Sequence, residues 1–196
     1  ILYSHMNNPI AGRTKTVQNY ISATYPDGHT ETLFIPLAPY ETPEALDRIC
    51  EEYNRVIGNM ELEPLIAIPI FIHDFLCIHP FNDGNGRMSR LLTTLLLYRS
   101  GFYVGKYISL EAKIAKNKDL YYDALAASQN GWHEGQDDPI PFVKYLLGTI
   151  LSAYRDFADR FAIVETKHSA IEKVRMATLN KIGRFTKQDI REQCPS

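Results

Sequence analysis

Residues 79–90 gather the side chains of this chain that could do chemistry together. The segment reads HPFNDGNGRMSR and holds an imidazole, a carboxylate, a Gly-Asn-Gly turn and two guanidinium groups. Its glycines let the backbone approach a ligand closely, and the unpaired N–H groups of a helix beginning here would favour an anion. Arg87 and Arg90 would lie on one face of that helix because they are three residues apart. The pattern predicts a polyphosphate site with a base, His79, at its rim.

Each polar group in the segment suits a different part of that site. Asp83 is a hard oxygen ligand suited to Mg²⁺, while Asn85 and the amides of Gly84 and Gly86 are neutral donors for phosphate oxygens. His79 is the group here that can accept a proton near neutral pH. Taken singly, such a histidine is usually structural and Asp-Gly-Asn-Gly is commonly a surface turn. Their combination at fixed offsets favours a functional interpretation.

The segment resembles the Fic family motif, His-x-Phe-x-Asp/Glu-Gly-Asn-Gly-Arg-x-x-Arg, at every fixed position. The resemblance extends over roughly residues 10–162. It implies a protein adenylyltransferase, which moves AMP from ATP onto a Ser, Thr or Tyr hydroxyl of a target protein and releases pyrophosphate. It also implies a mainly α Fic fold, a helical bundle with a small β-hairpin flap.

The resemblance assigns roles within the motif. His79 would take the hydroxyl proton, Asp83 would hold Mg²⁺, and Phe81 would be the buried anchor of the loop. The α- and β-phosphates of ATP would be bound by Gly84, Asn85 and Gly86. The β- and γ-phosphates would be bound by Arg87 and Arg90.

Outside the motif, the resemblance implies further contacts with nucleotide and target. Tyr121 or Tyr122 would line the nucleotide pocket, although both could fill the core instead. Asn130 would reach the adenine edge, although a helix C-cap before Gly131 explains it equally. A flap whose exposed edge pairs with the target's backbone would include Thr32, Leu33 and Phe34.

The elements that must position these residues are mostly helices. A turn at Tyr25–His29 between two β-rich runs, Thr16–Thr24 and Thr30–Ile35, predicts a hairpin. Helices are predicted over Thr42–Val56 with Thr42 as N-cap, from Pro64, over Gly86–Ser100, after a Ser109 cap, over Asn117–Ser128 and over Pro139–Phe161. The last carries an apolar stripe at helical spacing: Val143, Leu146, Leu147, Ile150, Tyr154, Phe157 and Phe161.

The pattern changes after this helix, which predicts a Fic domain over residues 1–162 and a helical tail over 163–196. Helices at His168–Lys181 and Lys187–Gln193 would form the start of a winged-helix or helix-turn-helix unit. An exposed tail or a dimerisation arm is an equal alternative. DNA is a partner only if the tail completes a winged helix, and a homodimer is left open.

Composition limits the other functional classes to which the protein could belong. A net charge of −2 supplies no basic field, so charge does not support nucleic-acid binding. Cys50, Cys77 and Cys194 lack metal-type spacing and fit a reduced, cytoplasmic setting. Apolar runs are far too short for a membrane span, so no membrane partner is expected.

Three alternatives bear on the site. The same fold could use UMP or phosphocholine as donor, or act as a nucleotide-sensing transcription regulator. His73 lies six positions before His79, with Asp74 beside it, but a histidine metal pair is not expected because helical ligands are usually three or four apart.

The family's inhibitory motif, Ser/Thr-x-x-x-Glu-Gly/Asn, would pair its Glu with Arg90. It is missing from residues 1–196, so we expect either an inhibitory helix before Ile1, which we favour, or control by another chain.

Overall fold

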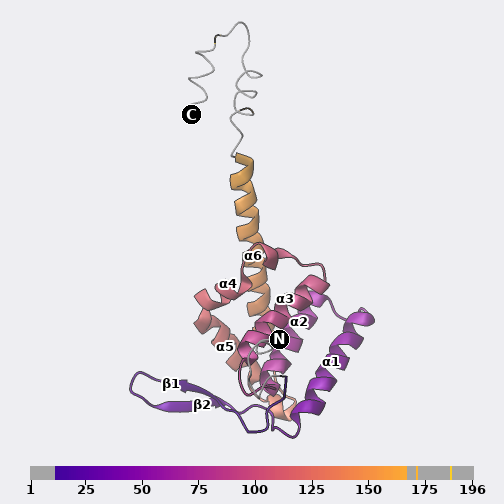
Figure 1. The fold of residues 1–196 in the computed structure, drawn as a ribbon, viewed down its shortest axis with the longest axis vertical. Helices are drawn as coiled ribbons and strands as arrows, with labels where there is room; N and C mark the ends of the chain where they lie inside the picture. The colour runs from indigo at the N-terminus through magenta and orange to yellow at the C-terminus, as the bar shows by residue number, and fades with distance from the viewer. Residues whose placement is uncertain (1–11, 167–170, 172–185, 187–196) are drawn as a thin grey trace. The chain divides into compact units, whose positions relative to one another are not determined.

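The computed structural model describes residues 12–166, Ile171 and Thr186. This part of the chain is mainly helical, as predicted, with one two-stranded antiparallel sheet (Figure 1). Its elements are β1 (Ile21–Thr24), β2 (Thr30–Phe34), α1 (Thr42–Gly58), α2 (Pro64–Ile78), α3 (Asn85–Arg99), α4 (Leu110–Lys116), α5 (Lys118–Gln129) and α6 (Ile140–Thr166). Two short 3₁₀ turns are η1 (Val104–Lys106) and η2 (Trp132–Glu134).

Helix α2 is the centre around which the other helices pack. Its sequence, PLIAIPIFIHDFLCI, is apolar on nearly every side, which is typical of a helix surrounded by protein. It packs against α1, α3 and α5 (Figure 1), and Ile68, Cys77 and Ile78 are completely buried. Burying one such aliphatic side chain stabilises a fold by about 1.5–3 kcal/mol. The packed end of α2 therefore gives residues 79–90 a rigid starting point.

Helix α6 supplies another part of the core. Val143, Leu146 and Ile150 of the predicted stripe are buried, and two further members are half-buried. Tyr154 is 38% exposed, so the stripe is interrupted at this position. The side chain of Phe161 lies outside the described part.

The predicted hairpin is present, with a bulge in its second strand. Ile21 pairs with Phe34 and Ser22 pairs with Thr32, which leaves Leu33 as an extra residue. A bulge of this kind bends the strand and re-aims its side chains. The strands are shorter than the β-rich sequence runs, with four residues in β1 and five in β2, of which Leu33 has no partner.

Of two predicted N-caps, the one of α4 is present and the one of α1 is not. Ser109 caps α4 as predicted, since its hydroxyl accepts a hydrogen bond from the Ala112 N–H at 3.0 Å. Thr42 is not the N-cap of α1, which is Glu41. The Thr42 hydroxyl is buried and donates to the Ala38 carbonyl at 2.9 Å. The tight turn before α1 takes the hydroxyl that a cap would have used.

The chain divides into two compact units, residues 1–153 and 154–196. The boundary after residue 162 stays a prediction. The predicted tail helices at His168–Lys181 and Lys187–Gln193 lie outside the described residues. Among the helices of the described part, none is long and apolar enough to cross a membrane.

The aromatic cluster at the start of α6 yields a stability prediction. Phe142 is 1% exposed, and its ring lies 5.8 Å from that of Tyr121 and 6.5 Å from that of Tyr145. Phe142→Ala should lower the free energy of unfolding by about 3–5 kcal/mol because it leaves a cavity. Leu151→Ala, at a 51% exposed position of the same helix, should cost less than about 1 kcal/mol. Urea denaturation measures both, and equal losses would contradict this core assignment.

Candidate active site

A cavity of about 980 Å³ brings most of the predicted site residues together. It is lined from strand β2, the start of α3, helix α5 and the turn η2. Its motif residues are His79, Gly86 and Arg90. It is also lined by the predicted flap and nucleotide residues Thr32, Leu33, Phe34, Tyr121, Tyr122 and Asn130. Segments distant in sequence thus share one concave surface within the size range of ligand sites.

The other predicted residues lie outside the lining of this cavity. Asp83, Gly84 and Asn85 belong to the loop and first turn before it, and Arg87 lines a neighbouring cavity of about 220 Å³ that Arg90 shares. Gly84 is the N-cap of α3 with a φ of 85°, a left-handed conformation that glycine adopts without strain. The chain can therefore turn directly from the loop into α3.

His79 ends helix α2 in a left-handed conformation, with φ of 51° and ψ of 61°. Such a conformation is uncommon for a residue with a Cβ, and it turns the chain sharply out of the helix. The Nδ1 atom lies 3.3 Å from the Leu76 carbonyl oxygen. In the tautomer that makes this hydrogen bond, Nδ1 carries the proton and Nε2 is an acceptor. The ring is thereby suited to accept a proton through Nε2.

Burial lowers the pKa of His79 below its ordinary value of 6.5. The ammonium group of Lys15 lowers the pKa further, whereas the hydrogen bond to the Leu76 carbonyl raises it. Charging the imidazole is disfavoured both by loss of water and by a neighbouring positive charge. His79 is therefore neutral at pH 7, which is the state that a general base requires.

Lys15 supports the loop from beneath and was not found by sequence reasoning. Its side chain is 2% exposed, and its Nζ donates to the Ile78 carbonyl at 2.8 Å and to Asn19 at 3.0 Å. Its backbone N–H donates to the Pro80 carbonyl at 2.8 Å. Burial lowers the pKa of Lys15 to about 8. Nothing in the local sequence marks this lysine, because the loop carbonyls that it binds, those of Ile78 and Pro80, lie more than sixty residues further along the chain.

Asn85 and Asn19 hold the loop backbone on either side of Phe81. The Asn85 side chain is 2% exposed, accepts from the Phe81 N–H at 2.9 Å and donates to the Phe81 carbonyl at 2.6 Å. Asn19 donates to the carbonyls of His79 at 3.2 Å and Phe81 at 3.1 Å. Asn85 is thus a clamp of the loop, and its predicted phosphate contact would have to come from its backbone. Phe81 itself is half-buried rather than buried.

The predicted metal ligand is held by its own loop. Asp83 accepts from the Gly84 N–H at 2.6 Å through Oδ1 and pairs with Arg87 Nη2 at 3.0 Å through Oδ2. Both side chains are largely exposed, so the pair contributes little to stability. The carboxylate and guanidinium therefore remain close together at little cost, ready to exchange partners.

Arg90 makes an ion pair that the sequence did not suggest. Its Nε lies 3.0 Å from Oε1 of Glu111, in the first turn of α4. Glu111 is 21 residues away and outside any inhibitory motif pattern, so only the docking of α4 reveals the contact. Arg90 is the more buried partner, with 29% of its side chain exposed.

The two tyrosines differ in their surroundings. Tyr121 is 8% exposed, packs edge-on against Phe142 and Tyr145, and has its pKa raised to about 12 by burial. Tyr122 is 49% exposed. Asn130 is exposed at the C-cap of α5, as the cap interpretation predicted, and lines the cavity as well.

The flap is tied to the turn η2. The ring of Phe34 stacks on that of His133, with centroids 5.5 Å apart, and His133 Nε2 lies 2.8 Å from the Ile35 carbonyl oxygen. Leu33 is 54% exposed at the bulge. The hairpin is therefore anchored at one end of β2 while its backbone edge remains available over the cavity.

Comparison with known proteins places these features in one family. The Fic/DOC family matches residues 2–97. A Fido domain-containing protein of Dictyostelium discoideum is 29% identical over 111 residues, 55% of this chain and 73% of that protein. Protein adenylyltransferase fic-1 of Caenorhabditis elegans is 30% identical over 136 residues, 69% of this chain but 22% of that protein. The chain therefore spans only about a fifth of the latter relative.

Solved structures give the same result for the fold. A Fic family protein from Desulfovibrio desulfuricans has a TM-score of 0.59 at 25% identity, covering 98% of this chain and 53% of that one. A Fic domain-containing signalling protein from Bacteroides thetaiotaomicron has a TM-score of 0.54 at 26% identity, covering 72% of this chain and 52% of that one. With its motif at the end of α2 and this shared fold, the chain belongs to the Fic/DOC family.

Proposed function

We propose that this chain is a protein adenylyltransferase that transfers AMP from ATP to a Ser, Thr or Tyr hydroxyl of a target protein. The observation that carries the proposal is the shared cavity of His79, Arg90 and the hairpin flap. A base, a cation for phosphate and an exposed strand edge then face the same space. Relatives named as protein adenylyltransferases support this chemistry.

The nucleotide would be bound mainly through its charge. ATP carries about four negative charges, which one Mg²⁺ and two arginines offset. Asp83 fits the metal because Mg²⁺ commonly takes one or two carboxylates together with substrate phosphates. Its carboxylate is 63% exposed and would leave Arg87, which is then available for phosphate oxygens. Mg²⁺ would neutralise phosphate charge, while Gly86 and Arg90 hold the nucleotide in the cavity.

The transfer step requires one proton acceptor. His79 Nε2 takes the proton of the target hydroxyl, and the hydroxyl oxygen attacks the α-phosphorus of ATP. The bond from the α-phosphorus to its bridging oxygen breaks, and pyrophosphate leaves with the electron pair. Help of this kind contributes about 10²–10⁴ to the rate. The hydrogen bond from Nδ1 to the Leu76 carbonyl stabilises the tautomer that leaves Nε2 unprotonated.

The target would be presented by strand addition to the hairpin. A flexible segment of the target that pairs with the backbone of Thr32–Phe34 would lie along the rim of the cavity. Backbone pairing places a side chain without reading its sequence, so the exposed Leu33 would supply part of the selectivity. The bulge at Leu33 separates the two paired positions of β2 and directs that side chain differently.

His79→Ala should abolish covalent AMP transfer and leave ATP affinity within about twofold. The base acts on the target hydroxyl, whereas charge holds the nucleotide. Transfer from α-labelled ATP to lysate proteins gives the first quantity, and calorimetry with Mg²⁺ gives the second. His29→Ala, in the exposed hairpin turn, is the matched control and should behave as the parent does.

Two outcomes would contradict this assignment. Transfer by His79→Ala at the parent's rate would remove the general-base role. Labelling by UTP or by a phosphocholine donor, with none from ATP, would replace the proposed donor while keeping the fold and the base.

Lys15→Met should shift the acid limb of the transfer rate to higher pH. Protonated His79 cannot accept a proton, so the rate falls as the pH falls through its lowered pKa. Removing the Lys15 ammonium raises that pKa, because a repelling charge is lost. Lys144→Met, at an exposed position of α6, should leave the limb unchanged. An unchanged limb in Lys15→Met would contradict the coupling.

The same variant has a separate effect on stability. Between pH 8 and 10.5 the unfolded chain keeps a proton on Lys15 that the folded chain has released, so the free energy of unfolding rises with pH. The rise amounts to about 3 kcal/mol over that window and should disappear in Lys15→Met. Urea denaturation at pH 8 and 10.5 checks this, with Lys144→Met retaining the rise.

Glu111→Gln should tighten ATP binding by less than about fivefold. Glu111 forms an ion pair with Arg90 that ATP would have to break, but an exposed ion pair contributes only about 0.2–1 kcal/mol of interaction free energy. Glu44→Gln likewise removes a charge from the first turn of a helix, α1, and should not change ATP affinity. Calorimetry with ATP and Mg²⁺ measures both variants. A change above tenfold would show that Glu111 controls the site more strongly than its exposure allows.

A further inference from the structure

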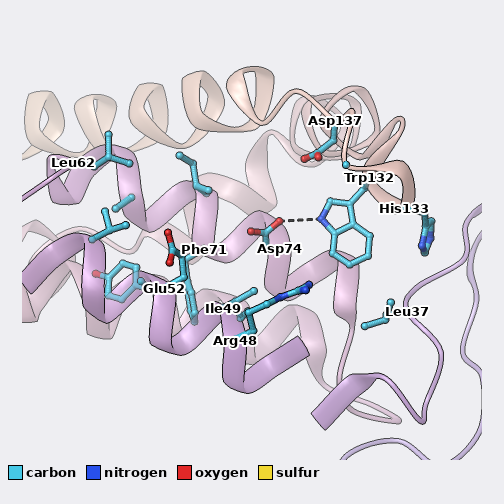
Figure 2. A pocket seen from close by; sticks show the side chains of 15 residues that line it. Leu37, Arg48, Ile49, Glu52, Leu62, Phe71, Asp74, Trp132, His133 and Asp137 are labelled. Carbon is cyan, nitrogen blue, oxygen red and sulfur yellow. Dashed lines mark hydrogen bonds between the residues drawn. The ribbon is translucent and has the colours of Figure 1, made fainter. Parts of the chain in front are cut away.

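A second cavity of about 560 Å³ lies between α1, α2 and the loop that joins η2 to α6 (Figure 2). Much of its lining is apolar, with Ile49 and Phe71 among its residues. Asp74 and Asp137 also line it, on the side where Figure 2 shows Trp132. His79, Asp83 and Arg90 are not among its lining residues, so it differs from the candidate active site.

Three potential ligands meet beside this cavity. His73 Nδ1 lies 3.5 Å from Asp74 Oδ1 and 3.8 Å from Asp137 Oδ2. The three ligand atoms lie within 4.8 Å of one another. His73 is completely buried, whereas the side chains of Asp74 and Asp137 are 30% and 20% exposed. The imidazole thus closes the site from inside, and the carboxylates leave a path from the cavity.

The buried imidazole has a polar atom without a hydrogen bond. His73 Nδ1 is buried and makes none within the described residues, and both carboxylate distances exceed the 2.7–3.2 Å of an N–H···O bond. An unsatisfied buried polar group costs about 1–3 kcal/mol. The separations instead match those between ligands of one ion, since metal–ligand bonds of about 2.1 Å at tetrahedral angles place ligands about 3.4 Å apart.

We propose that His73 Nδ1, Asp74 and Asp137 bind a divalent transition-metal ion. One imidazole and two carboxylates suit Zn²⁺, Mn²⁺ or Fe²⁺, whereas Mg²⁺ and Ca²⁺ prefer oxygen ligands alone. Three protein ligands would leave a coordination position open for water or a further ligand. This site is separate from the one that Asp83 would form for Mg²⁺.

Two residues next to the cluster contact its proposed ligands, as supporting residues do in metal sites. Trp132 Nε1 donates to Asp74 Oδ1 at 2.9 Å and fixes the carboxylate (Figure 2). Cys77 Sγ lies 3.6 Å from His73 Nε2, the nitrogen that a ligating Nδ1 would leave protonated. Such partners orient metal-binding histidines and carboxylates.

An ion at this cluster would link two separate parts of the structure. His73 and Asp74 belong to α2, whereas Asp137 follows η2, whose Trp132 and His133 line both cavities. An ion bound to all three would tie the wall of the candidate active site to the central helix. Sequence reasoning missed the cluster because Asp137 lies 63 positions beyond Asp74.

The single tryptophan of the chain provides a direct readout. Because Trp132 contacts a ligand carboxylate, Zn²⁺ binding should change its emission. Titration of the full chain with ZnCl₂, followed by fluorescence and calorimetry, should give one ion per chain at this site. Asp137→Asn should raise the Kd at least tenfold, since even supporting partners of metal sites contribute about 10–100-fold, and should abolish the emission change.

Matched variants separate this site from other binding. Asp138→Asn makes the same change one residue away at an exposed position outside the cluster, and asparagine can still accept the Ile140 N–H bond that Asp138 accepts at 3.0 Å. It should bind Zn²⁺ as the parent does, as should Asp83→Asn. If Asp137→Asn fails to melt cooperatively without metal, Asp74→Asn replaces it and should show the same loss.

Two results would overturn the proposal. One is Zn²⁺ binding by Asp137→Asn and Asp74→Asn with the parent's affinity. The other is parent emission that ignores Zn²⁺ but titrates with pH in metal-free buffer, which would assign the cluster to a protonated His73 paired with two carboxylates.

Discussion

The abrupt end of α2 is the constraint on which the candidate active site depends. His79 leaves the helix in a left-handed conformation, a strained choice that persists only where the surroundings hold it. Asn85 brackets the backbone of Phe81, and Lys15 and Asn19 bind carbonyls on both sides of the turn. Because the side chains of Lys15 and Asn85 are buried, water competes little for their hydrogen bonds, which strengthens them. The loop is thus fixed before any ligand arrives.

The site contains two kinds of interaction, buried hydrogen bonds that hold the loop and exposed ion pairs that a ligand can replace. The bonds of Asn85 and Lys15 are buried and shape the loop, whereas the Asp83–Arg87 and Arg90–Glu111 pairs are exposed and weak. A charged ligand can therefore take over those side chains without disturbing the backbone that presents them. The same distinction accounts for His79, whose ring is held through Nδ1 while Nε2 stays available as an acceptor.

The turn η2 connects the two cavities. Phe34 stacks on His133 above the larger cavity, and Trp132 binds Asp74 beside the smaller one. Both contacts come from a turn of three residues bounded by glycines with positive φ, Gly131 and Gly135. A Cβ at Gly131 would meet the Gln136 backbone at 3.2 Å, so the turn is tightly specified. Trp132 and His133 therefore belong to the walls of both cavities.

Local sequence determined the helices, the hairpin and the identity of the motif, because periodicity, caps and turn residues act over a few positions. It also placed Arg87 and Arg90 in the first turns of one helix, since their three-residue spacing follows from helical geometry. Tertiary structure decided that Asn85 clamps the loop, that Lys15 lies beneath His79, that Glu111 reaches Arg90, and that Asp137 meets His73. Each of these contacts joins residues through the packing of separate elements or the folding of the loop, which no local pattern encodes. Burial likewise depends on the whole fold, and it is the largest cause of the lowered pKa of His79.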